Sequence, residues 1–268
     1  MNRHILVCPL CGEDLTEGTA GTNKALKCPA GHSFDIAKEN YVNLLIRSSS
    51  SPTGDNREMA RSRHAFLSKG YYKCLADALG EVFSNTAANT ALDICCGEGY
   101  YTAELANKSQ CAFYGFDLSK DMVRLAAKRG CGACFFVANL NAIPVKSCAF
   151  DFAFHLFAPF DKDEFYRVVA DGGHLVTVIP GREHLLGLKE ILYKDVYLNE
   201  EEPPNAGDFV LADKIRVKAD ITVEKEDILP LFQMTPYYFK SPKEGLERLN
   251  TLDKLSTPTE FIMLVYKK

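Results

Sequence analysis

The chain has 268 residues, of which 47% are hydrophobic and 25% are charged, and its formal net charge is −4. This composition excludes a largely disordered or collagen-like chain, and the length fits about two domains. No uncharged apolar run approaches the roughly 18 residues that a transmembrane helix requires, and the net charge gives no overall nucleic-acid-binding signature.

Cysteine usage and the distribution of charge say more about the first part of the chain. The sequence begins Met1-Asn2-Arg3-His4 and reaches cysteine by position 8, which leaves no room for the apolar core of a signal peptide. Ten cysteines without such a leader are typical of thiols or metal ligands in a reducing compartment, so we expect a cytoplasmic protein. Residues 1–70 contain nine Lys/Arg against seven Asp/Glu while the rest is acidic, so a polyanion site is expected near the N-terminus.

Two cysteine-containing turns lie within the first 46 residues, which are poor in helical periodicity. They read Cys8-Pro9-Leu10-Cys11 and Cys28-Pro29-Ala30-Gly31-His32, with 16 residues between the two pairs. Because two tight turns can each present a ligand pair to one tetrahedral ion, the spacing predicts a zinc site formed by Cys8, Cys11, Cys28 and His32. Four protein ligands leave no open position for water, so the zinc is expected to be structural. A third pair, Cys131 and Cys134, has no matching partner pair and is predicted to be packed, reduced thiols.

The remaining chain predicts a linker followed by an α/β domain. Residues 47–57 read RSSSSPTGDNR, which is typical of a linker, and residues 58–83 have helical spacing that Gly70 divides into two helices. Short apolar runs then alternate with helical segments such as residues 120–129, a pattern typical of a parallel sheet covered on both faces. The predicted strands are residues 91–95, 111–116, 133–137, 150–154 and 174–179, with two further strands at 215–223 and 261–266.

A glycine-rich loop follows the first of these strands, in the segment Leu92-Asp93-Ile94-Cys95-Cys96-Gly97-Glu98-Gly99. Glycine lets the backbone approach a nucleoside-bearing ligand closely, although such a loop is as often only a structural turn. The next strand ends in Asp117, and a carboxylate at that position can accept hydrogen bonds from both ribose hydroxyls of an adenosine. The combination favours a nucleoside site.

These motifs carry a resemblance to a known family. DICCGEG at 93–99, GFDLS at 115–119, FDF at 150–152 and DGGHL at 171–175 resemble class I S-adenosylmethionine-dependent methyltransferases over residues 91 to about 180. With the segments CPLCG, CPAGH, HSFDIAKENYVNLL, GDNREMARSRHAFLSKGYY, PGREHL and QMTP, the chain resembles, end to end, the bacterial 23S ribosomal RNA (guanine-N1) methyltransferases (RlmA-like). The resemblance implies a Rossmann-like α/β fold, with a mostly parallel sheet that has helices on both faces and a small N-terminal zinc-ribbon-like domain.

The function and the site residues follow as implications of this resemblance. It implies methyl transfer from S-adenosyl-L-methionine to N1 of one of two neighbouring guanines in a hairpin loop of 23S ribosomal RNA, by a protein that forms a homodimer. It implies a zinc-binding, RNA-recognising domain at 1–46, a linker at 47–57 and a methyltransferase domain at 58–268. The implied cofactor-binding residues are Tyr72, Asp93, Gly97, Glu98, Gly99, Asp117, Asn139, Leu140 and His184. Two departures stand out, because Cys95 replaces the first loop glycine and Asn139 stands where the family usually has Asp.

Several assignments stay open at the level of sequence. By residue type alone, Tyr72 is a core aromatic and His184 is a surface residue at the start of a helix. No catalytic base is assigned, because Asp55, Asp161 and Asp163 are equally explained as solvated or helix-capping carboxylates. The candidates for stacking on the target base are Tyr71, Tyr72, Phe157 and Phe160, and those for contacting RNA phosphates are Lys24, Lys27, Lys38, Arg47, Arg57, Arg61 and Arg63. Two other functions remain: a zinc-containing RNA-binding protein with a non-catalytic cofactor site, and a methyltransferase acting on another RNA or a small molecule.

Overall fold

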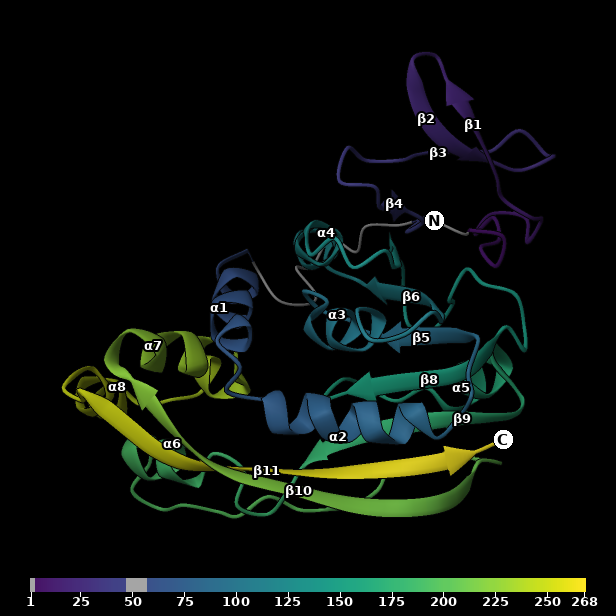
Figure 1. Ribbon diagram of the computed structural model, residues 1–268. Coiled ribbons are helices and arrows are strands. Elements are labelled where there is room, and N and C mark those ends of the chain that lie inside the picture. The colour runs from purple at the N-terminus through teal and green to yellow at the C-terminus, as the bar shows by residue number, and fades with distance from the viewer. Residues whose placement is uncertain (1–2, 47–56) are drawn as a thin grey trace.

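The computed structural model describes residues 3–46 and 57–268 (Figure 1). Its main feature is an eight-stranded sheet in the order β10-β11-β9-β8-β5-β6-β7-β4, in which the six strands from β9 to β4 run parallel and β11 is antiparallel to both of its neighbours, β9 and β10. The predicted linker at 47–57 lies outside the described residues except for Arg57, and so do Arg47 and Asp55. The strands are β4 (Val42–Asn43), β5 (Thr90–Ile94), β6 (Ala112–Asp117), β7 (Cys134–Val137), β8 (Phe150–Leu156), β9 (Val169–Pro180), β10 (Val210–Glu224) and β11 (Lys254–Lys267).

Helices cover both faces of this sheet, as the alternation of apolar runs and helical segments predicts. One face packs against buried side chains of α1–α4 and α6–α8, and the other against Phe165 and Val168 of α5. The helices are α1 (Arg57–Ser68), α2 (Lys73–Ser84), α3 (Tyr100–Ala106), α4 (Lys120–Lys128), α5 (Lys162–Val168), α6 (Leu186–Leu192), α7 (Lys225–Gln233) and α8 (Lys243–Asn250), with a 3-10 helix η1 (Pro236–Phe239). Gly70, with φ of 82°, separates α1 from α2 as predicted. Within the described residues, none of these helices is long and apolar enough to cross a membrane.

The N-terminal residues form a separate small sheet that is attached to the edge of the large one. Strands β1 (Thr16–Ala20), β2 (Asn23–Lys27) and β3 (Ser33–Asp35) are antiparallel and lie beyond β4 and β7 at one end of the molecule (Figure 1). The chain then joins the large sheet through β4, which pairs with β7, and Leu44 N donates to Val137 O at 2.9 Å. Leu6 and Leu26 are fully buried in the same core as Phe136, so the small sheet packs on the large one.

None of the ten cysteines, all of which lie within the described residues, forms a disulfide bond. Cys134 is buried at the start of β7 and Cys131 is half-buried just before it, a placement that fits the predicted packed thiols.

Candidate active site and metal centre

The four predicted zinc ligands converge at the base of the small sheet. One ligand atom from each of Cys8, Cys11, Cys28 and His32 lies within 4.8 Å of the others. Cys11 Sγ is 3.7 Å from Cys28 Sγ, and His32 Nδ1 is 3.3 Å from Cys28 Sγ. Because Zn–S bonds of about 2.3 Å at tetrahedral angles place two ligand sulfurs roughly 3.8 Å apart, this donor set fits a tetrahedral zinc ion.

The cluster is also built into the fold of the first residues. Gly12 and Gly31 both have positive φ, at 77° and 87°, and each closes the turn that follows a ligand. Gly12 N donates to Cys8 O at 2.8 Å, and Gly31 N donates to Cys28 O at 3.0 Å. Cys8 and Cys28 are buried, so a zinc ion held there would be closed off on one side by protein and would be structural rather than catalytic.

A cavity of about 470 Å³ opens where the parallel strands β5, β6, β7 and β8 end. This edge is where an open α/β sheet binds its ligands, because the loops after neighbouring strands diverge there. The sequence-predicted residues Gly97, Asp117, Asn139 and Leu140 all line the cavity, together with Cys95, Met122 and Phe157. The structure therefore brings together four of the nine residues that the family resemblance implies for the cofactor.

Asp117 connects the glycine-rich loop to the end of β6. Its Oδ2 accepts a hydrogen bond from Gly97 N at 3.0 Å, and its Oδ1 accepts one from Ser119 N at 2.8 Å. A carboxylate oxygen can accept more than one hydrogen bond, so these contacts are compatible with hydroxyl donors at the same group. Cys95 adopts a φ of 58°, so the loop does hold a side chain in the left-handed region where the family pattern has glycine.

The residues that line this cavity are of the types needed to bind S-adenosylmethionine. Asp117 would hold the ribose hydroxyls and the Asn139 and Leu140 backbone would lie beside the adenine, while the Gly97 loop would pass close to the methionine portion. The side chain of Asn139 is used locally, because its Oδ1 accepts from Asn141 N at 3.2 Å.

Three other predicted residues near this loop have internal partners and are not among the described residues that line the cavity. Asp93 is buried in β5, where its Oδ2 accepts from Thr102 Oγ1 at 2.5 Å and burial raises its pKa well above the usual range. Glu98 is buried against Arg129 and His64. Gly99 begins α3 with φ of 78°, and a Cβ there would lie 2.7 Å from Ala126 Cβ. Their direct contact with the cofactor stays a prediction.

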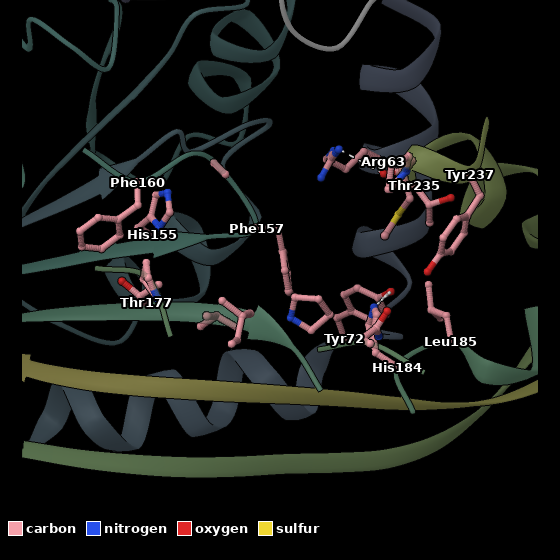
Figure 2. A pocket seen from close by; sticks show the side chains of 18 residues that line it. Arg63, Tyr72, His155, Phe157, Phe160, Thr177, His184, Leu185, Thr235 and Tyr237 are labelled. Carbon is pink, nitrogen blue, oxygen red and sulfur yellow. Dashed lines mark hydrogen bonds between the residues drawn. The ribbon is translucent and has the colours of Figure 1, made fainter. Parts of the chain in front are cut away.

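The two remaining predicted residues, Tyr72 and His184, line a second cavity of about 540 Å³ (Figure 2). Tyr72 Oη lies 3.4 Å from His184 Nε2, and both side chains are buried. Burial lowers the pKa of His184 to about 4, so its ring is neutral near pH 7. The same burial raises the pKa of Tyr72, which is therefore a neutral phenol.

The two cavities adjoin, because Arg63, Phe157, Ala158 and Phe160 line both of them. Figure 2 shows Phe157 in the middle of the second cavity, with Phe160 on one side and Tyr72 and His184 on the other. Phe157 stacks on His184 with ring centroids 6.2 Å apart and is still 41% exposed, so part of its ring is accessible for stacking on a ligand. Arg63 donates from Nη2 to Met234 O at 3.2 Å, which ties α1 to the end of α7.

The carboxylates considered as proton acceptors occupy other roles. Asp161 caps α5, with its side chain accepting from Glu164 N at 3.1 Å, as helix capping predicts. Asp163 is exposed in the first turn of the same helix. The sequence analysis did not identify His155 and Thr177, which line the second cavity. The signal was a single histidine within the apolar segment 152–156 of β8.

Replacing Asp117 by alanine is expected to weaken binding of S-adenosylhomocysteine by about 1.5–3 kcal/mol, because a charged hydrogen-bond acceptor is lost. Isothermal titration calorimetry measures this, with Asp163→Ala as the control that removes an exposed carboxylate outside the cavity. Equal affinities for the wild type and Asp117→Ala would contradict the assignment of this carboxylate to the ribose.

Comparison with known proteins agrees with this fold and site. Residues 6–46 match the zinc-ribbon family described as "RlmA, N-terminal", and residues 91–173 match the family described as "Methyltransferase domain". The Haemonchus contortus "Phospholethanolamine N-methyltransferase 2" has a similar fold, with a TM-score of 0.51 at 16% identity over 94% of this chain and 71% of that one. The fold and the cofactor cavity together define an S-adenosylmethionine-dependent methyltransferase with an N-terminal zinc ribbon.

Three relatives are similar over most of the chain. "Putative 23S rRNA (guanine-N(1)-)-methyltransferase YxjB" of Bacillus subtilis (strain 168) is 29% identical, with 97% of this chain and 96% of the relative covered. A protein of the same description from Micromonospora griseorubida is 32% identical over 70% of this chain and 69% of its own. The "23S rRNA (guanine(748)-N(1))-methyltransferase" of Streptomyces fradiae is 29% identical, with 91% of this chain and 89% of the relative covered. The chain belongs to this family of 23S rRNA (guanine-N1) methyltransferases.

Proposed function

We propose that the protein transfers the methyl group of S-adenosyl-L-methionine to N1 of a guanine in a hairpin loop of 23S ribosomal RNA. The observation that carries this proposal is the shared wall between the cofactor cavity and an aromatic-lined second cavity large enough for a base. A base that is methylated at a ring nitrogen must leave its stack, and aromatic faces such as Phe157 are the usual means of holding it.

In this reaction the main task of the protein is to align the cofactor and the target base. When bound, the cofactor supplies a methyl group that its sulfonium makes electrophilic. The residues common to both cavities, Phe157 and Ala158 among them, would bring N1 of the base into line with that methyl group. The N1 proton of guanine must also be lost, and we assign no general base for it.

Tritium transfer from labelled S-adenosylmethionine tests this function and separates it from the alternatives. We expect label in 23S ribosomal RNA, and none in transfer RNA or in an RNA-free extract. Because a methyl group on N1 blocks Watson–Crick pairing, reverse transcription should stop at the modified guanine. Label only in the RNA-free extract would indicate a small-molecule substrate, and no transfer with retained RNA binding would indicate a binding protein with a non-catalytic cofactor site.

We further propose that residues 1–46 contact the RNA backbone while residues 58–268 bind the cofactor, with residues 47–57 as a linker between them. The support is the position of the basic side chains: Lys24 and Lys27 are exposed on β2, and Lys38 is exposed after β3. Phosphate contacts of this kind give affinity without sequence specificity.

Replacing Lys24, Lys27 and Lys38 together by glutamine is expected to weaken RNA binding and to flatten its salt dependence. Each lost phosphate contact lowers the slope of log affinity against log salt by about 0.7–0.9, so three contacts lower it by roughly 2–3. Filter binding across a salt series measures the slope. The matched control replaces Lys225, Lys243 and Lys254, which are exposed on α7, α8 and β11 at the opposite end of the molecule (Figure 1). Equal slopes for the two triple variants would contradict an RNA-binding role for the small sheet.

Homodimer formation and a cytoplasmic location also belong to this proposal. The family resemblance supports the dimer, and β10 is an edge strand of the large sheet on which Val210 and Leu211 are exposed. An edge strand with exposed apolar residues is a ready pairing surface. The location follows from the substrate, because ribosomal RNA is made and modified in the bacterial cytoplasm. Sedimentation analysis tests the dimer.

A further inference from the structure

One end of the second cavity contains two buried polar atoms that have no hydrogen-bond partner among the described residues. They are His155 Nδ1 on β8 and Thr177 Oγ1 on β9. Both residues line the cavity, and they are only 2% and 1% exposed. They are register partners in the parallel pairing of the two strands, and Figure 2 shows them together beside Phe160.

Two such atoms in one cavity call for an explanation. A buried donor or acceptor without a partner costs about 1–3 kcal/mol, and nearly all buried polar groups in folded proteins are hydrogen-bonded. Here both atoms belong to neighbouring residues of a cavity that adjoins the cofactor cavity. A ligand that enters this cavity can supply both hydrogen bonds after a small side-chain movement that uncovers the two atoms.

The chemistry of the ligand follows from the state of the histidine. His155 Nε2 lies 2.8 Å from Pro159 O, and because a carbonyl oxygen only accepts, Nε2 carries the hydrogen. Burial lowers the pKa of His155 to about 4, so the ring is neutral near pH 7 and Nδ1 has a free lone pair. Nδ1 is therefore a fixed acceptor, whereas the Thr177 hydroxyl can turn to donate.

We propose that His155 Nδ1 accepts a hydrogen bond from the 2-amino group of the target guanine, and that the Thr177 hydroxyl donates one to its N3. This inference rests on the proposed function. Guanine combines an amino donor with a ring-nitrogen acceptor on its minor-groove edge, whereas adenine offers only acceptors there. The pair would therefore select guanine.

The same arrangement leaves the reacting nitrogen free. In guanine the 2-amino group lies between N3 and N1, so a base held by N3 and its amino group presents N1 away from Thr177. Phe157, Ala158 and Phe160 line both cavities, so the N1 side of the base can face the cofactor while an aromatic ring stacks on its plane.

The test uses hairpin RNAs that differ by one group at the target position: guanosine, inosine without the 2-amino group, or 3-deazaguanosine without the N3 acceptor. We expect wild-type kcat/KM for methyl transfer to fall roughly ten- to hundredfold on either analogue, the discrimination that a lost base contact gives. His155→Leu should show the same loss on guanosine and little further loss on inosine. Thr177→Val should do the same with 3-deazaguanosine. His155→Gln, which keeps an acceptor oxygen, should recover part of the guanosine activity.

The controls separate this inference from the function on which it rests. Calorimetry with S-adenosylhomocysteine should give unchanged affinity for every variant, which shows that the fold and the cofactor cavity are intact. Equal losses on guanosine and inosine in His155→Leu, or equal wild-type activity on the two RNAs, would overturn the recognition role. Tighter wild-type binding of the guanosine hairpin than of the inosine hairpin, without methyl transfer, would support recognition and refute the proposed function. Equal binding without methyl transfer would refute both.

Discussion

Replacing Cys28 by serine is expected to remove the zinc ion and unfold the small sheet while leaving the cofactor cavity able to bind its ligand. Structural zinc contributes an apparent binding free energy of about 10–16 kcal/mol in small zinc modules, and that energy is folding energy. The small sheet has three short strands, and β1 and β3 are mostly exposed, so apart from the packing of Leu6 and Leu26 against the large sheet it has little core of its own. Metal analysis after gel filtration should find one zinc per wild-type chain and none in the variant.

Binding measurements extend the same experiment to function. We expect Cys28→Ser to lose most of its RNA affinity and to bind S-adenosylhomocysteine within a few-fold of the wild type, because the lining of the cofactor cavity lies outside the small sheet. Cys148→Ser is the matched control, since Cys148 is exposed and is not a member of the ligand cluster. Normal zinc content in Cys28→Ser would refute the ligand assignment. An equal loss of RNA and cofactor affinity would mean that the small sheet mainly supports the large one.

Substitution is a better probe here than deletion of residues 1–46. That segment contributes β4 to the large sheet, and Leu6 and Leu44 are buried in the core that it shares with β7. Removing it would expose the edge of β7 and part of this core, so a loss of affinity could arise from damage to the sheet alone.

The sequence predicted the parallel strands well because each is a short apolar run closed by a turn signal. It did not predict β4, because a two-residue strand has no periodicity and is defined only by its distant partner, β7. The predicted strand at 215–223 was also too short, because β10 begins at Val210. The first five residues of β10 are all exposed, so no alternation of apolar and polar residues marks them. Pairing with β11, and not residue type, makes that segment a strand.

Part of the candidate site could likewise be predicted from the sequence, and part of it could not. Gly97 and Asp117 could be predicted together because loops after neighbouring parallel strands meet at one edge of a sheet, while Asn139 and Leu140 were implied by the family resemblance. The placement of Tyr72 beside His184 could not, because 112 residues separate them and only the packing of α2 and the loop after β9 brings them together. The direction of the Glu98 side chain depends on the turn between Gly97 and Gly99, whose positive φ values of 55° and 78° aim it away from the cofactor cavity.

Glu98 therefore provides the second large expected effect, on stability. Its carboxylate is 1% exposed, Arg129 Nε donates to its Oε2 at 2.9 Å, and His64 Nδ1 lies 2.7 Å from the same oxygen. Arg129 Nη2 also donates to Ser68 Oγ at 3.2 Å, so the carboxylate joins the glycine-rich loop to α1 and to the end of α4. Removing one partner of a buried ion pair leaves the other charge uncompensated, which costs about 3–5 kcal/mol.

We accordingly expect Glu98→Ala to lower the free energy of unfolding by about 3–5 kcal/mol, measured by denaturant titration, and Glu98→Gln to lower it less because the amide oxygen still accepts a hydrogen bond. Glu104→Ala is the matched control on α3, where a surface pair with Lys108 contributes under about 1 kcal/mol. Cofactor affinity distinguishes the two roles considered for this residue. If Glu98 only joins the glycine-rich loop to α1 and α4, Glu98→Ala should lose much stability. Its binding of S-adenosylhomocysteine should then change only modestly at temperatures where the variant is folded. Wild-type stability with a tenfold weaker affinity would instead place Glu98 in contact with the cofactor, and the loop would then have to turn its side chain toward the cavity on binding.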